Sequence, residues 1–277
     1  RAWHGFTLNS NYTWSRTIDD GGTFRTGYAI PIGAIAQQPD KSYPADRIER
    51  SLSTTDQRAH FVLTSVWALP IGKTYFAGSA AERAILGGFN LSGIYQAYSG
   101  SPLAITASSC QTNPAQGTCL PTLNPGFSGS PRQNGKWGHG VTWDTYNKVS
   151  FITPSTYSKD SNGNVTSVSG PFMPPVNGVL NNIAYVPAYT FSDSPRTAPY
   201  NLFGPGNYQL DLALTRSFPL HFSDSAKLNF RAEWYNITNH TQFAVASTQL
   251  GNSSFGQVTQ SNQLNRKSAQ FSARISF

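Results

Sequence analysis

The chain has 277 residues and is 38% apolar, 13% aromatic and rich in turn formers, with 24 glycines and 18 prolines. So little apolar content argues against a soluble protein with a deep core, and aromatics with turn residues favour an all-β protein. The net charge of +7 comes from scattered Lys and Arg; without the clustering that nucleic-acid binding requires, we expect no nucleic-acid partner.

The longest apolar stretch, FVLTSVWALPI, is interrupted by Thr and Ser. It is far shorter than the roughly 20 residues that a membrane-spanning helix needs. A tilted β-strand crosses the hydrocarbon layer with only about 9–11 residues, half of them polar, so β-strands remain a route across a membrane.

Alternation of polar and apolar residues predicts six strands along the chain. It is weaker in the first three strands and strict in the last three, for example in YQLDLALT, KLNFRAEWY and SAQFSARISF. Between the second and third strands, SAAE is a capping-box pattern that predicts one short surface helix. The predicted strands lie near residues 3–17, 57–69, 88–105, 205–218, 226–238 and 266–277.

The predicted connections are alternately long and short, and the longest covers residues 107–204. In an up-and-down sheet this gives one elaborate rim and one plain rim, as in bacterial outer-membrane barrels with long extracellular loops. With a periplasmic C-terminus, aromatic residues flank an aliphatic belt, as in the aromatic girdles of such barrels. Tyr12, Trp14, Tyr208 and Trp234 would lie near outer ends, and Trp67, Phe218 and Phe277 near inner ends.

Two cysteines, Cys110 and Cys119, lie close together in a polar segment of the longest connection. Their spacing allows a disulfide, which would indicate an oxidising compartment, and a pair of free thiols is the alternative. Neither has a histidine at metal-ligand spacing, and we expect no metal and no cofactor.

Several stretches together resemble the C-terminal barrel of TonB-dependent outer-membrane transporters, specifically the Oar-like group. They are YTWSRTIDD, RAHFVLTSVWALPIGK, LGGFNLSGIYQAYSGSPLAI, GPGNYQLDLALTRSFPL, LNFRAEWYNITNHTQF, FGQVT and the final FSARISF.

The resemblance implies a plugged barrel of about 22 strands, coupled through TonB to inner-membrane energy. Six strands cannot close, so residues 1–277 are expected to be the C-terminal portion of a larger barrel, without the plug domain and without the N-terminal region that meets TonB. Phe277, with Phe271 on the same face, resembles the terminal signal that the barrel-assembly machinery reads. The implied function is energised import of a bulky nutrient, such as a siderophore or an oligosaccharide.

Two sets of candidate site residues follow. Polar strand faces would line the lumen and form a charge network that braces the barrel against the plug, with a direct substrate site as the alternative; these residues are Gln209, Asp211, Arg231, Glu233 and Arg274. In the longest loop, Trp137, Trp143 and Tyr146 would stack a sugar or grip a siderophore, unless they pack the loop onto itself.

Three other function classes compete with a transporter. An enzyme is disfavoured because the histidines are dispersed and no G-x-S-x-G or HExxH motif occurs. A passive porin-like barrel and a secreted β-sandwich that acts as an adhesin or sugar-binding protein remain open. We expect the cell outer membrane as the location, with outer-membrane lipid and a small or oligomeric ligand as partners.

Overall fold

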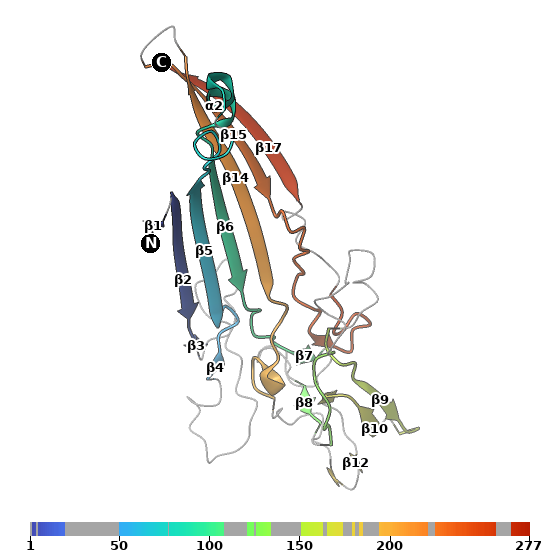
Figure 1. Ribbon diagram of the computed structural model, residues 1–277. Helices are drawn as coiled ribbons and strands as arrows, with labels where there is room; N and C mark the ends of the chain where they lie inside the picture. Colours follow the sequence, from blue (N-terminus) through green and yellow to red (C-terminus); the bar gives the residue numbers. More distant parts are fainter. Residues whose placement is uncertain are drawn as a thin grey trace.

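One antiparallel sheet dominates the computed structural model (Figure 1). Its long strands are β2 (Phe6–Trp14), β5 (Ala59–Ala68), β6 (Asn90–Tyr98), β14 (Asn207–Pro219), β15 (Lys227–Tyr235) and β17 (Ser268–Ser276), and the two-residue β1 (Ala2–Trp3) extends one edge. The structure describes residues 2–3, 5–19, 50–76, 78–107, 121–124, 126–133, 151–162, 165–173, 179–180, 183–184, 194–220, 225–258 and 267–277.

The strands follow one another across the sheet in the order β1-β2-β5-β6-β14-β15-β17, and each neighbouring pair is antiparallel. Within the described part of the chain, β17 and β1 are not paired with each other, so the sheet stays open. The predicted fold class is confirmed: an up-and-down antiparallel segment of an unclosed barrel, with one α-helix in the described ranges.

The register joins the apolar faces of all six long strands. Residues paired across antiparallel strands present their side chains on the same face of a sheet. We call this common surface the apolar face and the opposite one the polar face. One row of partners on the apolar face consists of Leu8, Ser65, Gly93, Leu212, Trp234 and Ala269, and the row beside it consists of Phe6, Trp67, Leu91, Leu214, Ala232 and Phe271.

Helix α2 (Ala80–Leu86) lies in the connection between β5 and β6, where SAAE predicts a helix. The Ser79 hydroxyl accepts a hydrogen bond from the Glu82 amide at 3.0 Å, and the Glu82 carboxylate accepts one from the Ser79 amide at 2.9 Å. Each residue therefore satisfies an end group of the helix that water would otherwise have to solvate. No described helix is long and apolar enough to cross a membrane.

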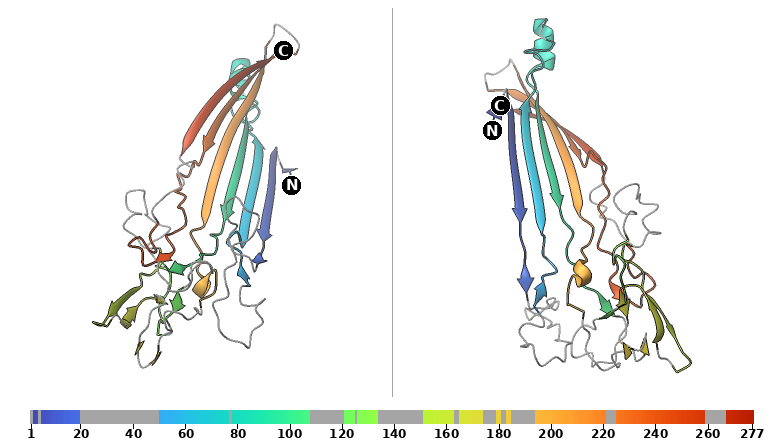
Figure 2. Two further views of the ribbon diagram at one scale, coloured as in Figure 1. Left: turned by 180° about the vertical axis from the view of Figure 1, so that it is seen from behind. Right: turned by 60° about the horizontal axis from the view of Figure 1, so that its bottom comes forward.

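The two ends of the sheet differ in complexity (Figures 1 and 2). One end carries α2 and the C-terminus, and the other carries the small strands of the long connections. These small strands pair as β3 (Ile18–Asp19) with β4 (Ser51–Leu52), β7 (Thr106–Ala107) with β16 (Gln249–Leu250), β8 (Thr122–Leu123) with β11 (Phe172–Met173), β9 (Thr156–Lys159) with β10 (Val165–Ser169), and β12 (Val179–Leu180) with β13 (Ile183–Ala184).

The hydrophobic core lies in the long connections and not in the sheet. Residues from the β6–β14 and β15–β17 connections pack into one cluster, in which the Phe172 ring meets the edges of Tyr200 and Phe255 with ring centres about 6 Å apart. Phe172, Phe151 and Val258 are completely buried. The cluster consists of Leu103, Ile105, Phe151, Ile152, Phe172, Leu202, Ala246, Leu250, Phe255 and Val258.

Phe172→Ala tests whether this core holds the long connections together. Removing a fully buried phenyl ring costs about 3–5 kcal/mol, which we expect to loosen the connections and to leave the main sheet intact. Limited proteolysis of the folded protein should then cut the β6–β14 connection faster. Tyr157→Ala, in the exposed β9–β10 hairpin, is the control and should behave as wild type. Equal cleavage rates for Phe172→Ala and wild type would contradict this role of the core.

Candidate functional site

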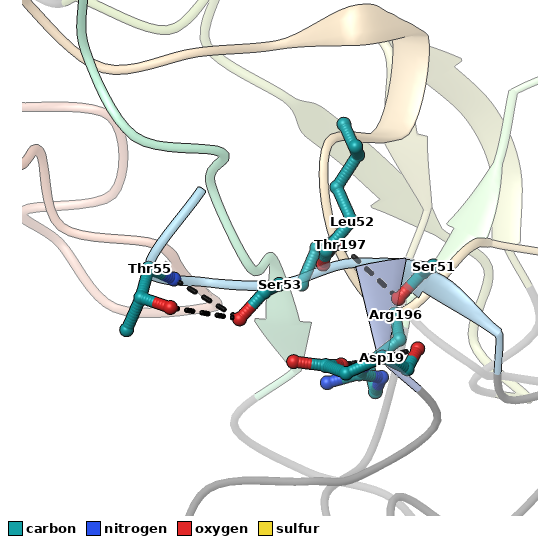
Figure 3. Close-up of polar contacts among 7 residues, drawn as sticks. All are labelled: Asp19, Ser51, Leu52, Ser53, Thr55, Arg196 and Thr197. Atoms are coloured by element: carbon teal, nitrogen blue, oxygen red, sulfur yellow. Dashed lines mark hydrogen bonds and ion pairs between the residues drawn. The ribbon is translucent and has the colours of Figure 1, made fainter. Parts of the chain in front are cut away.

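The first and second long connections are joined by a set of polar contacts (Figure 3). The Arg196 guanidinium forms an ion pair with the Asp19 carboxylate and donates a hydrogen bond of 3.0 Å to the Asp19 carbonyl. The Thr197 hydroxyl donates to the Leu52 carbonyl and lies 3.2 Å from the Ser51 hydroxyl oxygen. Residues 194–197 therefore fix the β3–β4 pair of the first connection against the second.

The second and third long connections are joined through backbone groups. The amides of Phe151 and Ile152 both donate to the Gly256 carbonyl, at 2.7 and 3.1 Å. β7 of the second connection and β16 of the third pair in parallel, and residues of both connections share the hydrophobic core. The described parts of all three long connections thus form one assembly at one end of the sheet, which we call the outer platform after the orientation proposed for it below.

Polar groups on the polar face meet the outer platform where β14 begins. The Asp211 carboxylate accepts hydrogen bonds from the Gln209 side-chain amide, at 2.8 Å to each oxygen, and from the Asn236 backbone amide at 2.7 Å. The Gln242 side-chain amide donates to Gln209 at 3.4 Å. Asp211 therefore ties the strand to the turn that follows β15, and its charge is stabilised by neutral donors.

The charged residues further along the polar face are arranged differently. Arg231 and Glu233, two residues apart on β15, form an ion pair at 2.5 Å. Arg274 makes no ion pair with any residue in the described ranges, and Asp211 contacts neither arginine there. Of the candidate network residues, the structure thus brings together Arg231 with Glu233 and, separately, Gln209 with Asp211.

His240 is a feature of this region that sequence reasoning missed. Its ring stacks on the Tyr208 ring, with 3.7 Å between centres and 20° between planes. Burial lowers the pKa of His240 from its usual 6.5, because the site disfavours the charged imidazolium. Asn236 holds the turn, since its side chain accepts from the His240 amide and donates to the His240 carbonyl. The NITNH stretch, rich in turn-forming Asn, is the signal that marks this site.

The remaining candidate residues fall into two groups. Phe271 and Phe277 are 65% and 83% exposed, and the Phe271 ring meets the edge of Trp234 at 6.3 Å on the apolar face. The loop candidates and the cysteines lie outside the described residues; these are Trp137, Trp143, Tyr146, Cys110 and Cys119.

The described side chains of this region can bind a ligand through hydrogen bonds and aromatic contacts. In the described part of the chain, His, Cys, Asp and Glu nowhere gather in a group of three or more that would hold a metal ion. The Asp211 carboxylate accepts hydrogen bonds from Gln209, and the Glu233 carboxylate accepts one from Arg231. The polar face thus carries amides, hydroxyls and the Arg231–Glu233 ion pair, together with Arg274, which has no ion-pair partner in the described ranges.

Comparison with known proteins gives one match. The family model described as "Outer membrane beta barrel domain" matches residues 1–270, which is nearly the whole chain. No curated protein and no solved structure matches the chain.

Arg196→Ala tests the joint between the first two connections. The change removes the ion pair and the bond to the Asp19 carbonyl; because Asp19 is partly exposed, we expect a loss of only about 1–2 kcal/mol of local stability. Hydrogen exchange at the amides of residues 51–53 should speed up roughly 5- to 30-fold. Lys159→Ala, in the exposed β9–β10 hairpin, is the control. Unchanged exchange in Arg196→Ala would show that the joint does not hold the platform.

Proposed function

The chain belongs to the outer membrane β-barrel domain family, and we propose from this premise that it forms the C-terminal strands of a TonB-dependent, Oar-like transporter. Such a transporter would import a bulky nutrient across the outer membrane with energy from the inner membrane. The observation that carries the proposal is the outer platform: three long connections packed into one assembly at one end of an unclosed, two-faced sheet.

The apolar face would meet the lipid of the outer membrane. A barrel in that membrane presents an apolar band to lipid and a polar surface to its interior. The register here gathers most of the apolar side chains of the six long strands on one face, with Val62, Val66 and Ile94 among the exceptions on the polar face. In this orientation the outer platform faces the cell exterior, and α2 and the C-terminus face the periplasm. Further strands would close the barrel, because an unpaired strand edge in lipid is too costly.

The outer platform would capture the nutrient at the mouth. A passive pore gains little from a large packed cap, whereas a transporter of a scarce ligand needs a shaped, preorganised surface that binds before passage. Trp137, Trp143 and Tyr146 belong to the connection that builds most of this platform, and we assign them to ligand contact by stacking. A siderophore or an oligosaccharide fits such a surface.

The polar face would line the lumen and meet the plug. Arg231 and Glu233 neutralise one another, and Asp211 is satisfied by neutral donors, which makes these groups suitable for bracing a neighbouring domain by hydrogen bonds. Gln209 and Arg274 present further polar ends on the same face. TonB would act through the plug-bearing N-terminal region of the full-length protein.

Phe271 and Phe277 would serve as the signal for the barrel-assembly machinery. Phe271 lies on the apolar face of β17, and Phe277 directly follows that strand; both side chains are exposed, so a partner that pairs with this edge could contact them. The exposed aromatic at position 277 would lie at the inner interface, where amphipathic and aromatic groups are favoured.

Single-channel recording with potassium chloride tests the proposal. The full-length protein in a planar bilayer should insert, because it is an integral barrel, and should stay closed at rest, because a plug fills the lumen. Urea at a concentration that leaves the barrel folded should then open conductance steps, because we expect the plug to loosen first. A pore that is open without urea indicates a passive porin, and failure to insert indicates the soluble adhesin; each result would contradict the proposal.

Uptake by cells tests the energy requirement. A ferric siderophore and a maltooligosaccharide, both radiolabelled, serve as probes of the two expected cargo classes. Accumulation of either one should depend on the full-length protein and should stop when a protonophore collapses the inner-membrane gradient. Uptake that continues with the protonophore would refute energised import.

A further inference from the structure

Arg216 is the only charged residue on the apolar face of the main sheet, among the residues that the structure describes. It lies near the inner end of β14 and is 7% exposed. Its guanidinium donates to the carbonyls of Ala84 and Ile85, the last turn of α2, and lies over the rings of Phe218 at 4.0 Å and Phe89 at 5.0 Å.

These contacts fix α2 on the outward side of the sheet. A cation at the C-terminal end of a helix satisfies carbonyls that have no partner within the helix. Because Arg216 reaches α2 from the apolar face, the helix stands beside the surface assigned to lipid, away from the polar face and any plug. Figures 1 and 2 show α2 close to the end of β14 in each view.

Two glycines, Gly72 and Gly87, lie in close contact where the two ends of the connection that carries α2 approach each other. A Cβ on Gly72 would lie 2.5 Å from the Gly87 Cα, and Gly72 has a φ of +78°, so only glycine fits there. The Leu69 amide donates to the Phe89 carbonyl at 2.9 Å just below this crossing. The described residues 69–76 and 78–89, which with the residue between them we call the inner turn, therefore hold a defined shape.

The inner turn exposes apolar side chains that none of the described residues covers. Tyr75, Phe76 and Ile85 are 61%, 67% and 64% exposed, and no residue of α2 is buried. A helix this short gains little stability by itself in water and needs an apolar surface to pack against. The apolar face of the sheet ends in Trp67 and Phe218 at the same rim.

The charge of the inner turn is positive. Lys73 and Arg83 are exposed and Arg216 lies at its base, whereas Glu82 is the one acidic residue in the described part of the turn and is engaged by the Ser79 amide. Exposed aromatics together with basic groups match the boundary of a bilayer that contains anionic headgroups.

We propose that the inner turn lies in the headgroup layer of the inner leaflet of the outer membrane and binds anionic phospholipid. Arg216 ties the turn to the barrel wall, Tyr75, Phe76 and Ile85 enter the acyl boundary, and Lys73 and Arg83 contact phosphate. Because Arg216 sits at the inner margin of the apolar face and is bonded to carbonyls, its charge costs far less than that of an arginine at the bilayer midplane.

Photo-crosslinking in the full-length protein tests this placement. p-Benzoylphenylalanine is incorporated in place of Ile85, and the protein is reconstituted into phosphatidylethanolamine vesicles that contain radiolabelled phosphatidylglycerol. Position 271 on the apolar face is the lipid-exposed control, and position 157 in the β9–β10 hairpin is the water-exposed control. Irradiation should transfer label to the protein from position 85 as it does from position 271, and not from position 157.

Removal of the basic groups tests the lipid charge. Lys73→Gln and Arg83→Gln, made separately, should each lower the phosphatidylglycerol label at position 85 by about fivefold, equivalent to ~1 kcal/mol per basic residue near an anionic surface. Label at position 271 should not change.

Three results would overturn the proposal. Absence of label at position 85 places the inner turn in water. A protein adduct there, in native outer membranes, assigns the surface to a protein partner or a second copy of the chain. Label that does not respond to either substitution removes the preference for anionic lipid.

Discussion

A single register across six long strands is the constraint on which the rest of the structure depends. Side chains alternate with a period of two, so a slip of one residue between any two strands would turn a whole set of apolar groups to the other face. Rows such as Leu8 to Ala269 cross the sheet without such a slip. Because the sheet has two chemically different faces, it can separate lipid from a polar interior while the hydrophobic core sits elsewhere, in the outer platform.

The two ends of the sheet carry different structures. At one end, long connections are packed by a buried core and held by contacts such as Arg196 with Asp19, so a large surface is presented as one body. At the other end, a closed inner turn is fastened to the wall by Arg216, the one described charge on the apolar face. In both places an arginine that would be costly alone is bonded to acceptors from a distant part of the chain.

The elements that depend on local sequence patterns were predicted correctly. Alternation located the six long strands, and the capping box located α2, because each depends on residues near one another. The outer platform escaped prediction because its strands are mostly two residues long and its partners are remote: Arg196 and Asp19 are 177 residues apart. The contacts of Arg216 could not be predicted from the alternation, because Arg216 occupies a position of the apolar face between Leu214 and Phe218. Its partners belong to α2, a helix in another connection. Among the candidate lumen residues, only contacts such as Arg231 with Glu233 were within reach of sequence reasoning, since both lie on one strand.

In the proposed orientation the apolar face meets lipid and the polar face does not. Leu214 and Thr215 are neighbours in β14 on opposite faces, so they form a matched pair for its most direct test. The measurement is the amount of folded full-length protein in the outer membrane, compared between Leu214→Arg and Thr215→Arg. We predict a strong loss for Leu214→Arg, because an arginine on the lipid face near the bilayer midplane costs about 2–4 kcal/mol and Leu214 lies near the middle of β14. We predict near-normal assembly for Thr215→Arg. Equal assembly of the two variants, or the reverse order, would contradict it.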